Sequence, residues 1–241
     1  MNKPGWIVGG NIGLGDALWL IKEAKPDCHN TFIGTPRTAE IVRVASVLTT
    51  VKIDNVVELA TPEEDSPGIP EYREWVKKYY TPHPDDDETF FDYPLHGNFG
   101  SFPLRCQYQP KDYTGTQLFS HRSKHHWPAL DEFMVIHSDA HRVVTFGTTR
   151  DEPWVGHQYQ GTLMEVAQAI LKCNIFIGLA SGITGLAVFL GVPTVVVSAI
   201  GEEFKVPPHM RHLVQPTVEQ IRGAYTDLKI RSDCGDLGER I

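Results

Sequence analysis

The feature that most constrains the fold is the stretch 159–198, in which helical and strand patterns alternate. Over residues 162–172 apolar side chains recur at helical spacing. Residues 174–178 form a short, continuous apolar run, as expected of a strand buried in a parallel sheet. A second apolar helix over 186–190 leads into a strand over 194–197. The pattern therefore predicts parallel strands joined by a right-handed crossover.

A turn of small residues, 180–185, follows the first of these strands. Such a turn, at the carboxyl end of a parallel strand and opening a helix, exposes backbone N–H groups beside the positive end of the helix dipole. Small residues such as Gly182 would let a phosphate approach the backbone of this turn, which also contains Ile183, and Ser181 and Thr184 add hydroxyl donors. The pattern supports equally the alternative that the glycines only permit a tight turn and close helix packing.

This stretch resembles the donor-domain signature of glycosyltransferase family 9, the heptosyltransferase-like enzymes of GT-B fold. The positions that match the family's turn, short helix and Gly-x-Pro strand are Ser181, Gly182, Ala187, Gly191 and Pro193. Two positions depart from the family: Ala180 stands where it has Asp, and Gly185 where it usually has His. In the family, those two side chains hold the donor sugar and phosphate. The resemblance implies that residues 181–184 bind the diphosphate of a nucleotide sugar.

The first residues of the chain predict a strand over 6–8, a glycine-rich loop and a helix from Asp16. The glycines do not follow the G-x-G-x-x-G order, so a nicotinamide site is disfavoured. Gly15-Asp16 resembles the Gly-Asp pair of the family, which implies that Asp16 deprotonates the acceptor hydroxyl and that Asn11, Gly13 and Gly15 form the acceptor-side loop. Taken alone, Asp16 would be read as a helix cap.

A second part of the resemblance lies after a short strand expected over 117–120. Lys124, followed by Trp127-Pro128 and a helix, matches the family's arrangement at this place. A departing diphosphate gains charge, and an enzyme without a metal ion must offset that charge with cations and amides. Lys124, Arg122 and Ser120 are therefore predicted to bind the donor diphosphate. No metal is expected, and the histidines of this loop are expected to be exposed.

A strand expected over 142–147 ends in a polar loop. Ligands gather at the carboxyl ends of parallel strands, so Gly147 and Thr148 are predicted to contact the nucleotide. Glu152 resembles the acidic residue that binds the ribose hydroxyls in the family. An exposed turn carboxylate is the alternative for Glu152.

The predicted fold class is α/β and GT-B-like, with two Rossmann-like, doubly wound domains, a cleft between them and a reduced N-terminal domain. We expect residues 1–110 to form the acceptor domain and 111–241 the nucleotide-sugar donor domain, with 107–115 as a polar connector. The last helix is expected over 216–228, followed by a polar tail over 229–241.

The composition is ordinary for a soluble globular protein: 241 residues, 41% hydrophobic and 22% charged. No run approaches the ~18 apolar residues of a membrane span. The first residues show no secretory leader, so the expected location is cytoplasmic. The net charge of −8 weighs against broad affinity for nucleic acid.

The predicted function is a metal-independent, inverting transfer of a sugar from a nucleotide-diphosphate sugar to the hydroxyl of a carbohydrate or other acceptor, with no further cofactor. Because Ala180 and Gly185 replace the family's Asp and His, a non-catalytic sugar- or nucleotide-binding protein is the second hypothesis. A transferase acting on a modified DNA base is the third, and the acidic stretch 61–92 speaks against the basic groove that it needs.

Overall fold

The computed structural model of the 241-residue chain describes residues 3–8, 14–22, 24, 28–58, 111–117, 125–146, 157–201 and 206–234. The chain divides into two compact units, Met1–Gly97 and Asn98–Ile241. The domain boundary expected between residues 110 and 111 lies at the edge of an undescribed stretch and stays a prediction. No helix in the described ranges combines the length and the apolar character needed to cross a membrane.

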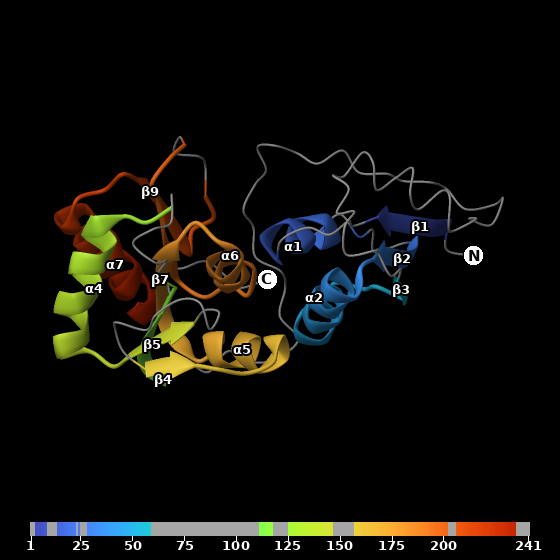
Figure 1. Cartoon of the computed structure of the whole chain (residues 1–241), viewed down its shortest axis with the longest axis horizontal. Coiled ribbons are helices and arrows are strands. Elements are labelled where there is room, and N and C mark those ends of the chain that lie inside the picture. The colour runs from blue at the N-terminus through green and yellow to red at the C-terminus, as the bar shows by residue number, and fades with distance from the viewer. Residues whose placement is uncertain are drawn as a thin grey trace. The chain divides into compact units, whose positions relative to one another are not determined.

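The first unit contains a parallel sheet with strand order β1-β2-β3 and helices that pack against each other (Figure 1). Its elements are β1 (Lys3–Val8), α1 (Leu14–Lys22), β2 (Cys28–Gly34), α2 (Pro36–Leu48) and β3 (Asn55–Glu58). Thr35 caps α2 by accepting a hydrogen bond from the Thr38 backbone N–H, and Pro36 suits the first helical position. Buried Phe32 and Ile33 on β2 supply the sheet side of the core.

The second unit is a parallel six-stranded sheet with helices on both faces (Figure 1). Its elements are β4 (Lys111–Gln117), α4 (Pro128–Ala140), β5 (Val143–Phe146), β6 (His157–Tyr159), α5 (Leu163–Ile170), β7 (Cys173–Leu179), α6 (Gly182–Phe189), β8 (Thr194–Ser198), β9 (Met210–Val214) and α7 (Val218–Asp233). Helices α4 and α7 pack together on one face, and α5 and α6 on the other (Figure 1).

The strand order of this sheet is β6-β5-β4-β7-β8-β9. The chain therefore moves outward from β4 through β5 to β6, and then returns to the other side of β4 to continue through β7, β8 and β9. This is the order of a doubly wound dinucleotide-binding sheet, and the direction reverses between β4 and β7. Ligands of such sheets bind outside the carboxyl ends of the strands at that reversal.

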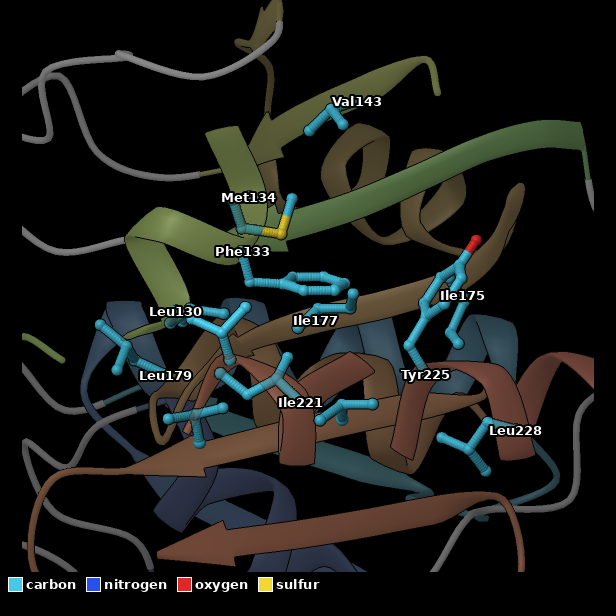
Figure 2. Close-up of a cluster of buried hydrophobic side chains, with 13 residues drawn as sticks. Leu130, Phe133, Met134, Val143, Ile175, Ile177, Leu179, Ile221, Tyr225 and Leu228 are labelled. Atoms are coloured by element: carbon cyan, nitrogen blue, oxygen red, sulfur yellow. The ribbon is translucent and has the colours of Figure 1, made fainter. Parts of the chain in front are cut away.

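A core cluster of the second unit lies between the sheet and the α4–α7 layer (Figure 2). Alternate residues of β7 face this layer, as the period of a strand requires. The labelled side chains in Figure 2 are Leu130, Phe133, Met134, Val143, Ile175, Ile177, Leu179, Ile221, Tyr225 and Leu228. On the opposite face, Phe176 packs against Phe146 with ring centroids 5.9 Å apart. Burial on both faces explains why β7 reads as a continuous apolar run.

The sequence-based position of β4 was wrong. Residues 111–115 were taken for a polar connector, yet they belong to a central strand that pairs with both β5 and β7. The sequence does not look like a buried strand, because its buried side chains include polar ones that find hydrogen-bond partners elsewhere in the fold. Thr116 Oγ1 donates to the Ile177 carbonyl at 2.6 Å, and Thr114 Oγ1 lies 2.9 Å from His137 Nε2. Because hydrogen-bonded hydroxyl groups can be buried at little cost, a strand with a polar sequence can lie in the middle of the sheet.

Other boundaries also differ from the predictions. Helix α6 begins at Gly182 rather than at residue 186, because Ser181 caps it. Helix α7 continues to Asp233, into the stretch expected to be a polar tail, because a helix with one buried face tolerates polar residues elsewhere. Strands β6 and β9 were not predicted; each lies at an edge of the sheet and pairs with one neighbour.

His137 is buried between α4 and α7. Its ring lies 4.3 Å from that of His141 and contacts Tyr225 edge-on at 4.7 Å. Burial, then the charges of His141 and Lys229, lower the pKa of His137 from 6.5 to about 4. The imidazole is therefore neutral in the folded protein at pH values where the unfolded chain would already be protonated.

We expect the free energy of unfolding to fall as the pH decreases from 6.5 toward 4, because the unfolded chain gains a proton that folded His137 does not. The loss should reach about 2 to 3 kcal/mol by pH 4.5. His137→Gln keeps a polar partner for Thr114 but cannot titrate, so its unfolding free energy should depend less on pH. Denaturant unfolding at pH 7.5 and 4.5 measures this, with exposed His157→Gln as the control. Equal pH dependence in His137→Gln and the wild type would contradict the assignment.

Candidate functional site

The predicted phosphate-binding turn lies at the reversal point of the six-stranded sheet. Gln117 ends β4 and pairs in register with Gly178 of β7. Strand β7 ends one residue later at Leu179, and α6 begins at Gly182 after Ala180 and Ser181. The turn therefore occupies the place where doubly wound sheets bind their ligands.

Ser181 organises the first turn of α6. Its backbone is extended, with φ −156° and ψ 168°, and its Oγ accepts a hydrogen bond from the Thr184 N–H at 3.3 Å. Its carbonyl accepts from the Gly185 N–H at 2.8 Å. The N–H groups of Gly182 and Ile183 have no intrahelical partner, as at every helix start, and no acceptor among the described residues bonds to them. Two backbone donors at the positive end of α6 are thus available to a ligand.

The side chain of Ser181 joins the turn to β4. Its hydroxyl donates to Oε1 of Gln117, a side chain that is only 5% exposed. Ser181 Oγ also lies 3.1 Å from Thr184 Oγ1. Because the Thr184 side chain is fully buried, its hydroxyl holds the turn together, and the ligand contact predicted for that hydroxyl stays untested.

Sequence reasoning missed Gln117, which had been taken for the first residue of a strand. In the structure it is the last residue of β4 and contacts the candidate anion-binding turn. Its Ser181 partner is 64 positions away in the chain, so no local pattern reports the contact. The available signal was a polar residue at the carboxyl end of a strand beside a glycine-containing turn.

Gly178 permits the close approach of α6 to β7. A Cβ at this position would lie 2.4 Å from Thr184 Oγ1, 3.1 Å from Phe176 Cε1 and 3.3 Å from the Gln117 backbone nitrogen. Contacts below 3.0 Å essentially do not occur in folded proteins. The absence of a side chain at Gly178 therefore fixes the distance between the strand and the turn.

The Trp-Pro pair at the start of α4 has a structural role. Trp127 occupies the N-cap position, and its Nε1–H donates to the carbonyl of Pro216 at 2.8 Å, just before α7. His126 was expected to be exposed, but its Nε2 forms a close contact with Asp131 Oδ2, and its side chain is 15% exposed. The two residues hold the described segment that leads into α4.

Several predicted site residues lie outside the described residues: Asn11, Gly13, Ser120, Arg122, Lys124, Gly147, Thr148 and Glu152. Gly15 and Asp16 lie in the first turn of α1, in the first unit. Asp16 is the third residue of this helix, so it does not occupy the N-cap position that its sequence suggested. A carboxylate in a first helical turn is stabilised in its ionised form by the helix dipole.

No group of three or more His, Cys, Asp or Glu side chains within the described ranges is arranged to hold a metal ion. The described part of the candidate site instead consists of uncharged groups: the Gly182 and Ile183 amides, beside the Ser181 hydroxyl and the Gln117 carboxamide that are hydrogen-bonded to each other. Such a set suits the binding of an oxyanion.

No protein-family model and no curated protein matches the sequence. Solved structures similar in fold include three that align over nearly the whole chain. A glycosyl transferase of family 9 from Veillonella parvula DSM 2008 is 13% identical, with a TM-score of 0.65, over 95% of this chain and 98% of that one. E. coli heptosyltransferase WaaC, with ADP-2-deoxy-2-fluoro heptose, is 11% identical, with a TM-score of 0.62, over 93% and 99%.

The third structure, E. coli ADP-heptose lps heptosyltransferase II, is 12% identical, with a TM-score of 0.57, over 95% of this chain and 99% of that one. At this level of identity the comparisons establish the fold. The chain has the α/β, GT-B-like fold of these heptosyltransferases, which confirms at the level of the fold the resemblance to glycosyltransferase family 9.

Proposed function

We propose that this protein transfers a sugar from a nucleotide-diphosphate sugar to the hydroxyl group of an acceptor, without a metal ion and with inversion at the anomeric carbon. The observation that carries this proposal is the start of α6 at the strand-order reversal, where the Gly182 and Ile183 amides and the Ser181 hydroxyl can meet a diphosphate. E. coli WaaC, which has this fold, is known with ADP and with ADP-2-deoxy-2-fluoro heptose.

In the proposed reaction, the acceptor oxygen attacks the anomeric carbon as the bond from that carbon to the diphosphate breaks. The diphosphate leaves with the bonding electron pair, and Asp16 takes the proton of the acceptor hydroxyl. The α6 amides and the side chains of Ser120, Arg122 and Lys124 stabilise the charge that develops on the leaving group. The α6 amides are held by the helix before the reaction, so they need little reorganisation during it.

The remaining assignments belong to the same proposal. Gly147, Thr148 and Glu152 contact the nucleotide, and Asn11, Gly13 and Gly15 form the acceptor-side loop. Residues 1–110 are the reduced acceptor domain and 111–241 the donor domain, and the protein acts in the cytoplasm. The acceptor is a carbohydrate or another molecule with a free hydroxyl group.

The test is the melting temperature of the full chain in the presence of ADP, UDP, GDP, CDP or dTDP. One of them should raise it by about 5 to 10 °C at 100-fold excess over its dissociation constant, because it binds only the folded state. Lys124→Ala should abolish most of this shift, whereas exposed Lys172→Ala should retain it. No shift with any nucleoside diphosphate would contradict the proposed function, and an unchanged shift in Lys124→Ala would remove that lysine from the site.

A further inference from the structure

We propose that Ile200, in a loop positioned by Gln215, contacts the sugar of the donor, and that this sugar presents a methyl group to it, as a 6-deoxy sugar does. The inference rests on the proposed function, which places the donor diphosphate at the start of α6. It assigns a sugar-binding side chain, and with it a class of donor, to the carboxyl end of β8.

The loop after β8 begins beside the turn that opens α6. Strands β7 and β8 pair in register up to Leu179 and Val197, and the Ala180 N–H then donates to the Val197 carbonyl at 2.8 Å. Residues 180–182 and 198–200 therefore leave the same edge of the sheet from neighbouring positions. Adjacent strands lie about 5 Å apart, so a ligand at the start of α6 extends readily to the loop after β8.

Hydrogen bonds from Gln215 hold the backbone of this loop. Gln215 follows β9, its N–H donates to the Ser198 carbonyl at 2.9 Å, and its Nε2 donates to the Ala199 carbonyl at 3.0 Å. Its backbone is left-handed, with φ 47°, a conformation that residues other than glycine rarely adopt. Such conformations cost free energy and are concentrated at functional sites. The loop is therefore fixed at a cost that packing alone does not explain.

Ile200 is the side chain that this fixed loop presents. It is 61% exposed, although the residue before it is held by Gln215. The chain continues through Gly201, which has φ 105° and around which a Cβ would meet no atom within 4 Å. Ligand sites are lined mainly by apolar side chains, and in sheets of this kind they lie outside the carboxyl ends of the strands. Ile200 meets both conditions.

The strand order indicates which part of the donor reaches Ile200. The proposed nucleotide contacts follow β5, and the diphosphate lies where β4 and β7 end. Strand β8 is on the other side of β7 from β5. In a nucleotide-diphosphate sugar, the nucleotide and the sugar occupy opposite ends of the diphosphate. Because the proposed nucleotide extends toward β5, the sugar extends toward β8.

The exposed side chains at this end of the site select the chemistry of the sugar. Ala180 and Ile200 are both exposed, and neither has a side-chain donor or acceptor. A sugar hydroxyl placed against them would lose its water without gaining a partner, which costs free energy. A methyl group in the same place gains free energy by leaving water.

The test compares affinities of the full chain, measured by calorimetry, for a matched pair of nucleotide sugars. Both are built on the nucleoside diphosphate that raises the melting temperature, and they differ only in a methyl or a hydroxymethyl group at carbon 6. For GDP the pair is GDP-6-deoxymannose and GDP-mannose. The deoxy sugar should bind roughly 3- to 10-fold more tightly, as expected for the burial of a methyl group in place of a polar one.

Ile200→Ser should remove this preference, while the affinity for the nucleoside diphosphate alone should change less than about twofold. Ile230→Ser is the matched control, because Ile230 on α7 is 57% exposed and should leave the preference intact. Gln215→Gly keeps access to the left-handed backbone but loses the hydrogen bond to Ala199, so it should weaken the preference as well. A merely structural role of Gln215 would lower stability without changing the ratio of the two affinities.

Equal affinity of the wild type for the two sugars, or a preference that persists in Ile200→Ser, would overturn the inference and leave the proposed function standing. A preference that persists in a folded Gln215→Gly would overturn the positioning role of Gln215. A wild type that binds no nucleoside diphosphate would overturn the proposed function together with the inference.

Discussion

Asp16→Asn should reduce the rate of sugar transfer roughly 100- to 10,000-fold, the range that a general base contributes to catalysis. Asparagine has nearly the same shape as aspartate but cannot take a proton from the acceptor hydroxyl. Asp16 lies in the first turn of α1. The dissociation constant of the donor should stay unchanged, because the proposal places the donor in the other unit.

The measurement is the release of nucleoside diphosphate at saturating donor, with and without acceptor, combined with donor binding by calorimetry. Glu40→Gln is the control, because it removes one exposed carboxylate from α2 of the same unit. This variant should transfer at the wild-type rate. If Asp16→Asn turned over within a few fold of the wild type, Asp16 would not be the base. Loss of donor affinity together with activity would indicate a structural role for Asp16.

Gly178→Ala should lower the free energy of unfolding by about 1 to 3 kcal/mol, as overpacking does in well-packed interiors. The added methyl group would lie 2.4 Å from Thr184 Oγ1 and 3.3 Å from the Gln117 backbone nitrogen. Thr184 is fully buried and holds the α6 cap, so the strain must move the turn away from β7. Pyrophosphate affinity should therefore fall together with stability.

The same substitution at another glycine gives a matched control with the opposite sign. Gly223 lies inside α7, and a Cβ built there meets no atom within 4 Å. Gly223→Ala should raise the free energy of unfolding by roughly 0.5 to 1 kcal/mol, because alanine loses less backbone entropy in a helix than glycine. Denaturant titration compares the two variants. A Gly178→Ala variant as stable as the wild type would show that the junction of β4, β7 and α6 is looser than described.

The sequence predicted those helices and strands whose buried side chains are mainly apolar. Strands β7 and β8 and helices α4 and α5 follow from runs in which most buried positions are apolar, such as Ile175, Ile177 and Val195. Their order alone indicates parallel strands with crossovers. The family resemblance, read from Ser181, Gly182 and their neighbours, then predicted the fold that the structural comparisons support.

The central strand β4 was not predicted because several of its buried side chains are polar. Tyr113 donates to the Ala169 carbonyl at 2.6 Å, and Thr116 donates to that of Ile177. These partners lie 56 and 61 positions away, so no window of the sequence contains both members of a bond. Gln117 was missed for the same reason. A local pattern reports apolar periodicity, but it cannot report which distant group satisfies a buried polar atom.

The start of α6 was placed too late because its first residues are small. Gly182 and Gly185 suggested a turn, yet Ser181 caps a helix that already includes both. The available signal was Ser181, a favoured N-cap residue type five residues before the predicted start, which accepts the capping hydrogen bond from Thr184. The difference matters chemically, because the earlier start brings the positive end of the helix directly to Ser181, Gly182 and Ile183.

The central claim is that a nucleoside diphosphate binds at the start of α6, and backbone amide NMR tests it most directly. The full chain, labelled with ¹⁵N, is titrated with the nucleoside diphosphate that raises the melting temperature. We predict that the Gly182 and Ile183 amide resonances shift with the same saturable dissociation constant, because their N–H groups donate to the phosphate oxygens. Saturable binding that leaves both resonances in place would contradict the account.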